Sequence, residues 1–169
     1  MEPTDVREAF HGSFIRVDVE AWPAGEREIV RHPGACAVVA FVDEHDVLLV
    51  RQIREAVRQA LLEVPAGVLD VPGEDGAGCA VRELMEETGH RVTAIEPLGA
   101  IYSSPGFTDE RIELFLARAE PTGTPAAEAG IEVVRTPFGE SLRAVRDGEI
   151  EDAKTVAALL LAADRRSQG

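Results

Sequence analysis

Apolar residues occupy every second position between residues 14 and 21 of this 169-residue chain. Alternation of this kind is typical of a strand that buries its apolar face and exposes its polar face. Turn-forming residues follow at 22–25, and residues 27–31 have the composition of a returning strand. The N-terminus is therefore predicted to form a β-hairpin.

Two continuously apolar stretches come next, at residues 35–42 and 47–50, with a polar turn between them. Such runs are typical of strands that are buried on both faces. Shorter apolar segments and weaker alternation predict four more strands. These lie at residues 62–64, 92–101, 111–119 and 131–136.

A helix is predicted at residues 77–88, where Asp75 is suited to cap the N-terminus and Gly89 the C-terminus. Its apolar side chains share one face, which is expected to pack on the core. They are Ala80, Val81, Leu84 and Met85. Two further helices are predicted after the last strand, at residues 139–146 and 153–165.

This order of elements predicts an α/β protein, with helices covering a mixed sheet in an α/β/α sandwich. A chain of 169 residues suits a single domain with a proper hydrophobic core. Within it, we expect residues 1–34 to form the N-terminal hairpin region and residues 35–169 to form the main domain.

The chain is acidic, with 17 Lys and Arg against 31 Asp and Glu and a net charge of −14. This balance argues against non-specific nucleic-acid binding and against an anionic membrane surface as the partner. No apolar run approaches the ~18 residues of a membrane helix, and the first 11 residues lack a secretory signal. A polyanionic substrate would have to be attracted by a metal ion and a few local arginines.

Two cysteines, Cys36 and Cys79, fall in a predicted strand and a predicted helix. At these positions they are expected to be buried free thiols. A cytoplasmic location is therefore expected.

Three carboxylates and one arginine occur within residues 82–87. Glu83 and Glu87 are four positions apart and share one helix face, and Glu86 flanks them. Like charges at this spacing weaken an isolated helix, so a cation is expected to balance them. Carboxylate oxygens suit Mg²⁺ or Mn²⁺, and the Pro- and Gly-rich residues 65–76 are predicted to form a loop beside them.

This part of the chain resembles the Nudix box, whose pattern is G-x5-E-x7-R-E-U-x-E-E-x-G-U, where U is aliphatic. The matching residues are Gly67, Glu74, Arg82, Glu83, Glu86, Glu87 and Gly89. Two positions depart from the pattern: six residues rather than five separate Gly67 from Glu74, and the last position is His90.

The resemblance implies a Nudix fold and a site for Mg²⁺, in which Mn²⁺ could substitute. Glu83 and Glu87 would bind the metal together with the backbone carbonyl of Ala66. Glu86 would bind a further metal or orient the cluster. Arg82 would orient its carboxylate neighbours, a role compatible with a structural salt bridge.

Segments outside the box, at residues 51–54, 63–67 and 104–110, resemble the ADP-ribose pyrophosphatase branch of that family. This branch implies a homodimer whose N-terminal sheets pack across subunits, with a partly shared active site. Arginines at a strand end can also be merely exposed, but their planar forks suit phosphate oxygens. The substrate contacts expected on this basis are Arg31, Arg51, Arg54, Gly67, Leu69, Phe107 and Glu110.

The branch commonly places a catalytic glutamate in the loop before the last strand. Here that loop, residues 125–130, has alanines where acids would align, and Glu128 is the nearest carboxylate. Glu128 is our candidate general base, against the alternative of a solvated loop acid. If Glu128 does not serve, the base is Glu86, Glu110 or a metal-bound hydroxide.

The function expected from the resemblance is Mg²⁺-dependent hydrolysis of ADP-ribose to AMP and ribose 5-phosphate. Hydrolysis of another nucleoside diphosphate sugar is the first alternative. A non-catalytic nucleotide-sensing module is the second, although the intact acidic cluster argues against it. A purely structural interaction protein would leave that cluster unexplained.

Overall fold

Ten strands and three helices make up the computed structural model, which describes residues 2–123 and 130–168. Seven strands form the main sheet, with β10, β5, β4, β9 and β8 in that order, β6 paired with β5 and β7 paired with β4. Their bounds are β4 (Ala35–Phe41), β5 (Asp46–Arg54), β6 (Gln59–Glu63), β7 (Ala66–Val68), β8 (His90–Tyr102), β9 (Arg111–Pro121) and β10 (Glu132–Pro137).

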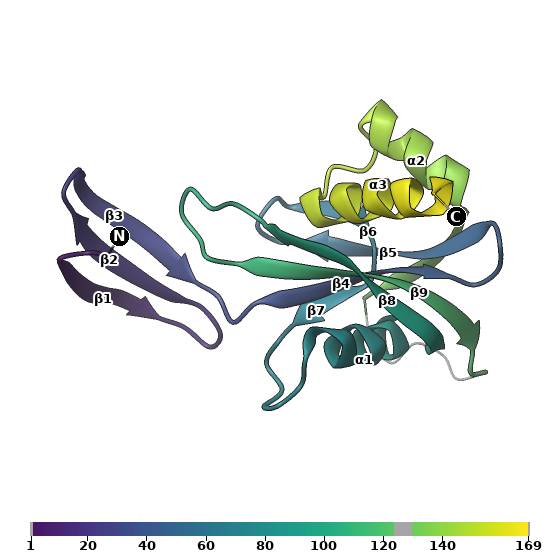
Figure 1. Ribbon diagram of the computed structural model, residues 1–169, viewed down its shortest axis with the longest axis horizontal. Coiled ribbons are helices and arrows are strands. Elements are labelled where there is room, and N and C mark those ends of the chain that lie inside the picture. The colour runs from purple at the N-terminus through teal and green to yellow at the C-terminus, as the bar shows by residue number, and fades with distance from the viewer. Residues whose placement is uncertain (1, 124–129, 169) are drawn as a thin grey trace.

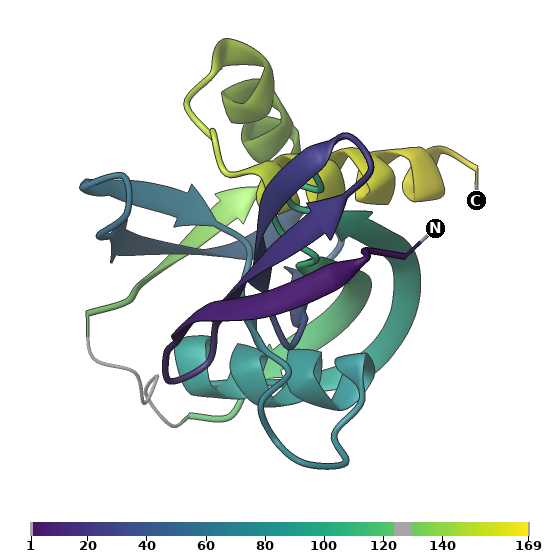
Figure 2. The same cartoon turned by 90° about the vertical axis from the view of Figure 1, so that its left-hand side faces the viewer.

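The main sheet is mixed and is covered on both faces. Strands β4 and β9 are parallel, whereas the other pairs are antiparallel. Helix α1 (Gly76–Thr88) lies on one face, and α2 (Phe138–Asp147) and α3 (Ala153–Ser167) lie on the other (Figures 1 and 2). The predicted α/β fold with its layered helices is therefore confirmed.

Strand β4 is the centre of the core, because all seven of its residues are buried. Alternate side chains of a strand point to opposite faces. Val39 and Phe41 accordingly join the cluster beneath α3, and Val38 and Ala40 join the cluster beneath α1. Burial on both faces explains the continuous apolar run in the sequence.

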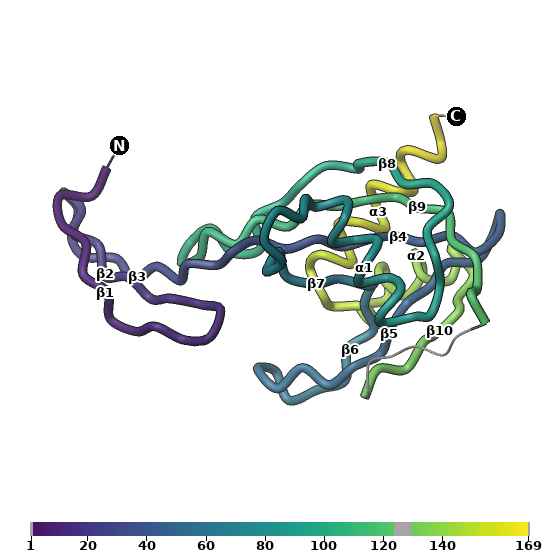
Figure 3. Tube along the Cα trace, turned by 90° about the horizontal axis from the view of Figure 1, so that it is seen from below, coloured from purple at the N-terminus to yellow at the C-terminus, as the bar shows by residue number. Residues whose placement is uncertain are grey.

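A separate three-stranded sheet extends from the main body (Figures 1 and 3) and consists of β1 (Asp5–His11), β2 (Arg16–Trp22) and β3 (Gly25–Arg31). The predicted hairpin is β2–β3. Strand β1 was not predicted, and all seven of its residues are exposed. A strand without a buried face leaves no clear hydrophobic pattern in the sequence.

The buried face of β2 is the polar one, contrary to the prediction. Asp18 and Glu20 are only 3% and 4% exposed, whereas the valines between and before them are half-buried. Arg31 of β3 donates to both carboxylates, with 3.1 Å between its Nε and Asp18 Oδ2. Arg31 also donates to Asp109 at 3.0 Å, which ties this sheet to the loop after β8.

Helix α1 is capped as predicted but turned differently about its axis. Ala80 and Leu84 are fully buried, but Val81 and Met85 are 39% and 36% exposed, so the predicted stripe was partly wrong. The face toward the sheet instead includes two carboxylates, because the backbone of β7 lies opposite them. Strand β7 itself occupies part of the predicted loop, where it pairs with β4.

Both cysteines are free and buried, as predicted. No helix in residues 2–123 and 130–168 is long and apolar enough to cross a membrane.

Candidate active site

The position of helix α1 is fixed at both ends by the residues predicted to cap it. Asp75 Oδ1 accepts a hydrogen bond of 2.8 Å from the backbone N–H of Gly78. Gly89 adopts a left-handed conformation with φ of 70°, which glycine reaches without steric cost. These caps set the register in which the acidic turns of α1 face β7.

Glu83 lies directly against the backbone of Gly67 on β7. A Cβ atom at residue 67 would come within 1.9 Å of the Glu83 carboxylate carbon. Glycine is thus required at this position for space, since no larger residue permits the approach. The motif therefore contains both Gly67 and Glu83 for a physical reason: the glycine leaves the space that the glutamate side chain occupies.

Glu87 is the second carboxylate on this face of α1, and it is only 3% exposed. Its Oε2 accepts a hydrogen bond of 3.2 Å from the backbone N–H of Ala66. The two glutamates are one helical turn apart and both buried against adjacent residues of β7. Burying charged groups is costly unless they are paired and hydrogen-bonded, so this arrangement requires compensation.

Arg82 supplies much of that compensation. Its Nη1 donates to Glu83 Oε1 at 2.7 Å and to Glu86 Oε2 at 3.2 Å, while Nη2 donates to Glu74 at 3.0 Å. The hydrogen bonds that Arg82 donates to Glu74 and Glu83 raise its pKa, although partial burial opposes the shift. Arg82 therefore remains cationic and joins all three predicted motif acids other than Glu87.

A second ion-paired cluster is centred on Glu63, which is fully buried. Arg54 donates Nε and Nη2 to its two carboxylate oxygens, at 2.8 and 2.7 Å, and Lys154 of α3 donates to Oε2. Burial alone would raise the pKa of Glu63, but the hydrogen bonds from Arg54 and the charge of Lys154 lower it below its usual range. Glu63 therefore stays ionised and holds both cations in place.

A cavity of about 340 Å³ lies beside both clusters. Four predicted residues line it: Arg54, Ala66, Gly67 and Glu110. The other nine lining residues were not predicted, and those with polar or aromatic side chains are Phe14, His32, Ser103, Asp152 and Lys154. His32 Nε2 lies 3.6 Å from Glu110 Oε1, so the segment before β4 contributes to the wall.

One of the cavity residues that were not predicted, Lys154, is conspicuous in the sequence. Lys154 is the single lysine, because the other 16 of the 17 basic residues are arginines. It follows Asp152, whose Oδ1 accepts its hydrogen bond at 3.0 Å. No local pattern, however, could show that Lys154 meets Glu63, 91 positions earlier.

Four other predicted substrate contacts lie away from this cavity within the described chain. Arg31 is held in the N-terminal sheet, and Arg51 is exposed and pairs with Glu132 at 3.3 Å. Leu69 packs beside Gly34, and Phe107 is largely exposed. Glu128 falls outside the described residues. The roles of these residues stay predictions.

The donor chemistry of α1 fits a hard divalent cation, because Glu83, Glu86 and Glu87 offer only carboxylate oxygens. Within residues 2–123 and 130–168, no three acidic, His or Cys side chains are arranged as a metal-holding group. The reason is visible in the contacts: Arg82 and the N–H of Ala66 engage the carboxylate oxygens.

Comparisons with known proteins agree with the motif. The NUDIX domain family matches residues 30–164. The ADP-ribose pyrophosphatase of Bacillus subtilis strain 168 is 37% identical over 147 residues, covering 85% of this chain and 79% of that protein. A GDP-mannose pyrophosphatase of Cronobacter sakazakii is 36% identical over 151 residues, covering 78% of each. A solved structure of an ADP compounds hydrolase shares the fold, with a TM-score of 0.81 and 24% identity over 100% of this chain and 97% of that one.

The ion pairs of Glu63 predict a specific dependence of stability on pH. Because the pKa of Glu63 is lowered by folding, its contribution is present above the ordinary glutamate pKa of about 4.3 and is lost as pH falls through the lowered value. Glu63→Gln should cost about 3 kcal/mol at neutral pH, since it leaves Arg54 without its counter-charge and Lys154 with Asp152 alone.

The difference between wild type and Glu63→Gln should shrink as the pH falls below the ordinary glutamate pKa of about 4.3 and disappear once the pH is below the lowered pKa of Glu63, where Glu63 of the wild type is also neutral. Urea unfolding at several pH values measures it. Glu140→Gln, which removes an exposed ion pair with Arg143, is the matched control and should change stability little. A difference that is constant across this pH range would contradict the assignment.

Proposed function

The chain belongs to the NUDIX family of hydrolases, and from that premise we propose that it is a Mg²⁺-dependent pyrophosphohydrolase. ADP-ribose and water would give AMP and ribose 5-phosphate, with cleavage of one bond to the bridging pyrophosphate oxygen. The observation that carries the proposal is the placement of Glu83 and Glu87 against Gly67 and Ala66, beside a cavity lined by Arg54 and Lys154.

Glu83 and Glu87 would hold the metal together with the Ala66 carbonyl, and Glu86 would hold a further ion or orient the cluster. When bound, Mg²⁺ neutralises pyrophosphate charge and lowers the pKa of a water molecule. Arg82 has a supporting role, because its hydrogen bonds to Glu74, Glu83 and Glu86 fix where those carboxylates point.

The cations of the cavity are suited to orient the substrate phosphates. Glu63 uses Nε and Nη2 of Arg54, and within the described chain Nη1 makes no hydrogen bond, so it can donate to a phosphate oxygen. A fixed guanidinium loses little conformational freedom when it binds. Positioning of this kind supplies much of the rate in phosphoryl transfer.

We choose ADP-ribose as the proposed substrate because the segments flanking the box resemble the ADP-ribose pyrophosphatase branch. The Bacillus subtilis relative also carries that name. GDP-mannose is the second candidate, favoured by the relative from Cronobacter sakazakii. Both are nucleoside diphosphate sugars, so the chemistry at the pyrophosphate is the same in either case.

The N-terminal sheet supports a homodimer as the working form. It projects from the main body (Figure 1), and Val6 and Phe10 of β1 and Phe14 of the β1–β2 turn are each more than half exposed. Pairing with a second copy would cover them. Light scattering should therefore give the dimer mass for the wild type and the monomer mass for Phe10→Asp. A monomeric wild type at micromolar concentration would rule this out.

Substitution of Gly67 tests the packing of Glu83 against β7. In Gly67→Ala the new methyl group displaces the Glu83 carboxylate, and a misplacement of about 1 Å can lower kcat/KM roughly 10²-fold. The fold should persist, because the displaced atoms end a flexible side chain. Gly139→Ala is the control, since nothing lies within 4 Å of its added Cβ. Unchanged activity in Gly67→Ala would show that Glu83 need not occupy this position.

Glu87→Gln should lower turnover of ADP-ribose by several orders of magnitude, because it removes the charge while keeping an acceptor for the Ala66 N–H. Release of AMP in the presence of Mg²⁺ measures the effect, and circular dichroism should show an unchanged fold. Glu140→Gln, on α2, should retain full activity. Near-normal turnover in Glu87→Gln would contradict the assignment of Glu87 as a metal ligand.

The same assay with Glu128→Gln tests the general base. A large fall in kcat with little change in KM would support Glu128. Normal kcat would leave Glu86, Glu110 or a metal-bound hydroxide as the base, and Glu86→Gln and Glu110→Gln would then be measured in the same assay.

Substrate preference is tested by kcat/KM for ADP-ribose and GDP-mannose under identical conditions. We expect the higher value for ADP-ribose, because the resemblance of the flanking segments is to that branch. A higher value for GDP-mannose would keep the proposed chemistry and change the substrate.

A further inference from the structure

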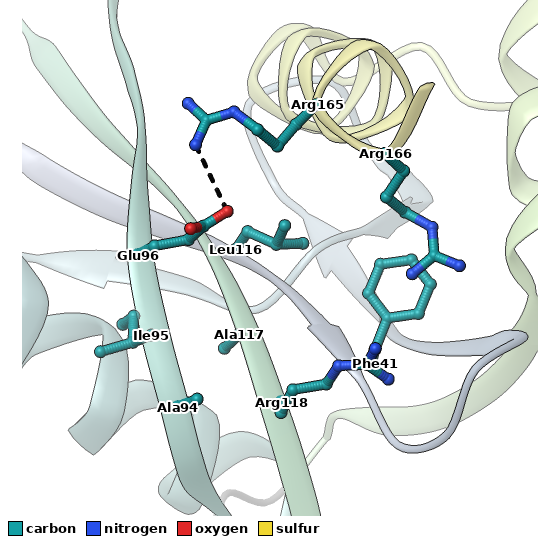
Figure 4. Close-up of a pocket in the computed structure, with 9 residues that line it drawn as sticks. All are labelled: Phe41, Ala94, Ile95, Glu96, Leu116, Ala117, Arg118, Arg165 and Arg166. Carbon is teal, nitrogen blue, oxygen red and sulfur yellow. Dashed lines mark hydrogen bonds and ion pairs between the residues drawn. The ribbon is translucent and has the colours of Figure 1, made fainter. Parts of the chain in front are cut away.

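Glu110 lines the cavity of about 340 Å³ in the candidate active site, but its partner is neither an arginine nor a lysine in the described chain. A carboxylate at the other large cavity of the main body has a different environment, because Glu96 pairs there with Arg165 at 3.4 Å (Figure 4). Glu110 instead faces a histidine, with 3.6 Å between His32 Nε2 and Glu110 Oε1. His32 is thus the polar side chain available to hold this carboxylate.

The backbone of Glu110 is fixed by the loop that it ends. Its N–H donates to Thr108 Oγ1 at 3.2 Å, and its carbonyl accepts a hydrogen bond of 3.1 Å from the N–H of Ser103. Asp109, the preceding residue, accepts a hydrogen bond of 2.9 Å from the backbone N–H of His32. The main chain around Glu110 is therefore held in place, and its side-chain contacts decide where the carboxylate points.

The ring of His32 is held on two sides and is only 10% exposed. Its Nδ1 accepts a hydrogen bond of 3.1 Å from the N–H of Gly34, whose φ of 101° glycine reaches without steric cost. The ring of Phe14 lies edge-on to it, with 5.8 Å between the two centroids. Because Nδ1 accepts, the proton of the neutral ring lies on Nε2, the nitrogen that faces Glu110.

The distance of 3.6 Å between these two groups is longer than a hydrogen bond. Hydrogen bonds of a catalytic site are often long without substrate and shorten when substrate binds. A hydrogen bond from an N–H group to a carboxylate is charge-assisted and directional. Once formed, it would fix one oxygen of Glu110 and leave the other for the substrate.

We propose that His32 is a positioning residue for the hydrolysis assigned above, because its Nε2–H orients the carboxylate of Glu110 at the cavity wall. The inference rests on the proposed function, in which Glu110 is either a substrate contact or a candidate base. His32 acts through Glu110 and does not need to touch the substrate. The turn formed by His32, Pro33 and Gly34 thereby gains a role, since it sets the ring orientation.

Two substitutions separate the two ring nitrogens. His32→Asn keeps an acceptor in the place of Nδ1 but removes the Nε2–H, whereas His32→Gln keeps a donor near the place of Nε2. We expect kcat/KM for ADP-ribose to fall roughly tenfold in His32→Asn, through loss of a hydrogen bond to a charged group, and to stay near the wild-type value in His32→Gln. His45→Asn, in the exposed β4–β5 turn, is the matched control and should leave kcat/KM unchanged.

The double variant His32→Asn/Glu110→Ala distinguishes positioning from a merely structural role. If His32 acts through Glu110, each single substitution should change the same parameter, KM for a substrate contact or kcat for a base. His32→Asn should then cost nothing further once Glu110 is alanine. Additive losses, an equal loss in His32→Gln and His32→Asn, or normal kinetics in His32→Asn would each overturn the proposal.

A measurement on the protein without substrate keeps this proposal separate from the proposed function. Long-range proton–nitrogen magnetic resonance spectra at about pH 8 report which ring nitrogen of a neutral histidine carries the proton. We expect the Nε2–H tautomer for His32, with an Nε2 shift that changes in Glu110→Ala and not in His45→Asn. The Nδ1–H tautomer, or an unchanged Nε2 shift in Glu110→Ala, would overturn the proposal.

The same spectra decide the matter if His32→Asn does not fold. They also decide it if the wild type hydrolyses no nucleoside diphosphate sugar, a result that would contradict the proposed function alone.

Discussion

The structure depends on the burial of two like-charged carboxylates, Glu83 and Glu87, between α1 and the backbone of β7. Left alone, this pair would repel and would lose its hydration. Arg82 balances one charge through a 2.7 Å hydrogen bond, and the Ala66 N–H accommodates the other. Gly67 makes the approach sterically feasible. A divalent cation at these oxygens would relieve the remaining repulsion. The two carboxylates that are costly to bury are thus the same two that are proposed to bind the metal.

The rest of the fold positions this pair and the cavity beside it. Strand β4 is buried on both faces and therefore holds α1 and α3 on opposite sides of one sheet. Its partner β7 carries the residues against which Glu83 and Glu87 pack. Helix α3 brings Lys154 to Glu63 and so fixes Arg54 at the cavity wall.

Features encoded locally could be predicted from the sequence. The spacing of Glu83 and Glu87, the caps Asp75 and Gly89, and the buried run of β4 are consequences of helix and strand periodicity alone. The layered α/β fold was predicted from the order of the elements and the family from the motif, and both were confirmed by the structure and the comparisons.

Features that depend on distant partners could not be predicted. The polar face of β2 is buried because Arg31 reaches Asp18 and Glu20, and periodicity assigns polar residues to solvent. Val81 and Met85 are exposed because α1 turns Glu83 and Glu87 toward β7. The pattern of apolar residues along α1 does not show this contact. Lys154 meets Glu63 only through the tertiary fold.

Titration with Mn²⁺, followed by the electron paramagnetic resonance signal of the free ion, tests the central claim most directly. It reports metal binding at the α1 carboxylates without depending on substrate identity. The account predicts saturable binding to the wild type and an affinity at least tenfold lower in Glu83→Gln and Glu87→Gln, with both variants folded. Equal Mn²⁺ affinity in the wild type and the two variants would contradict it.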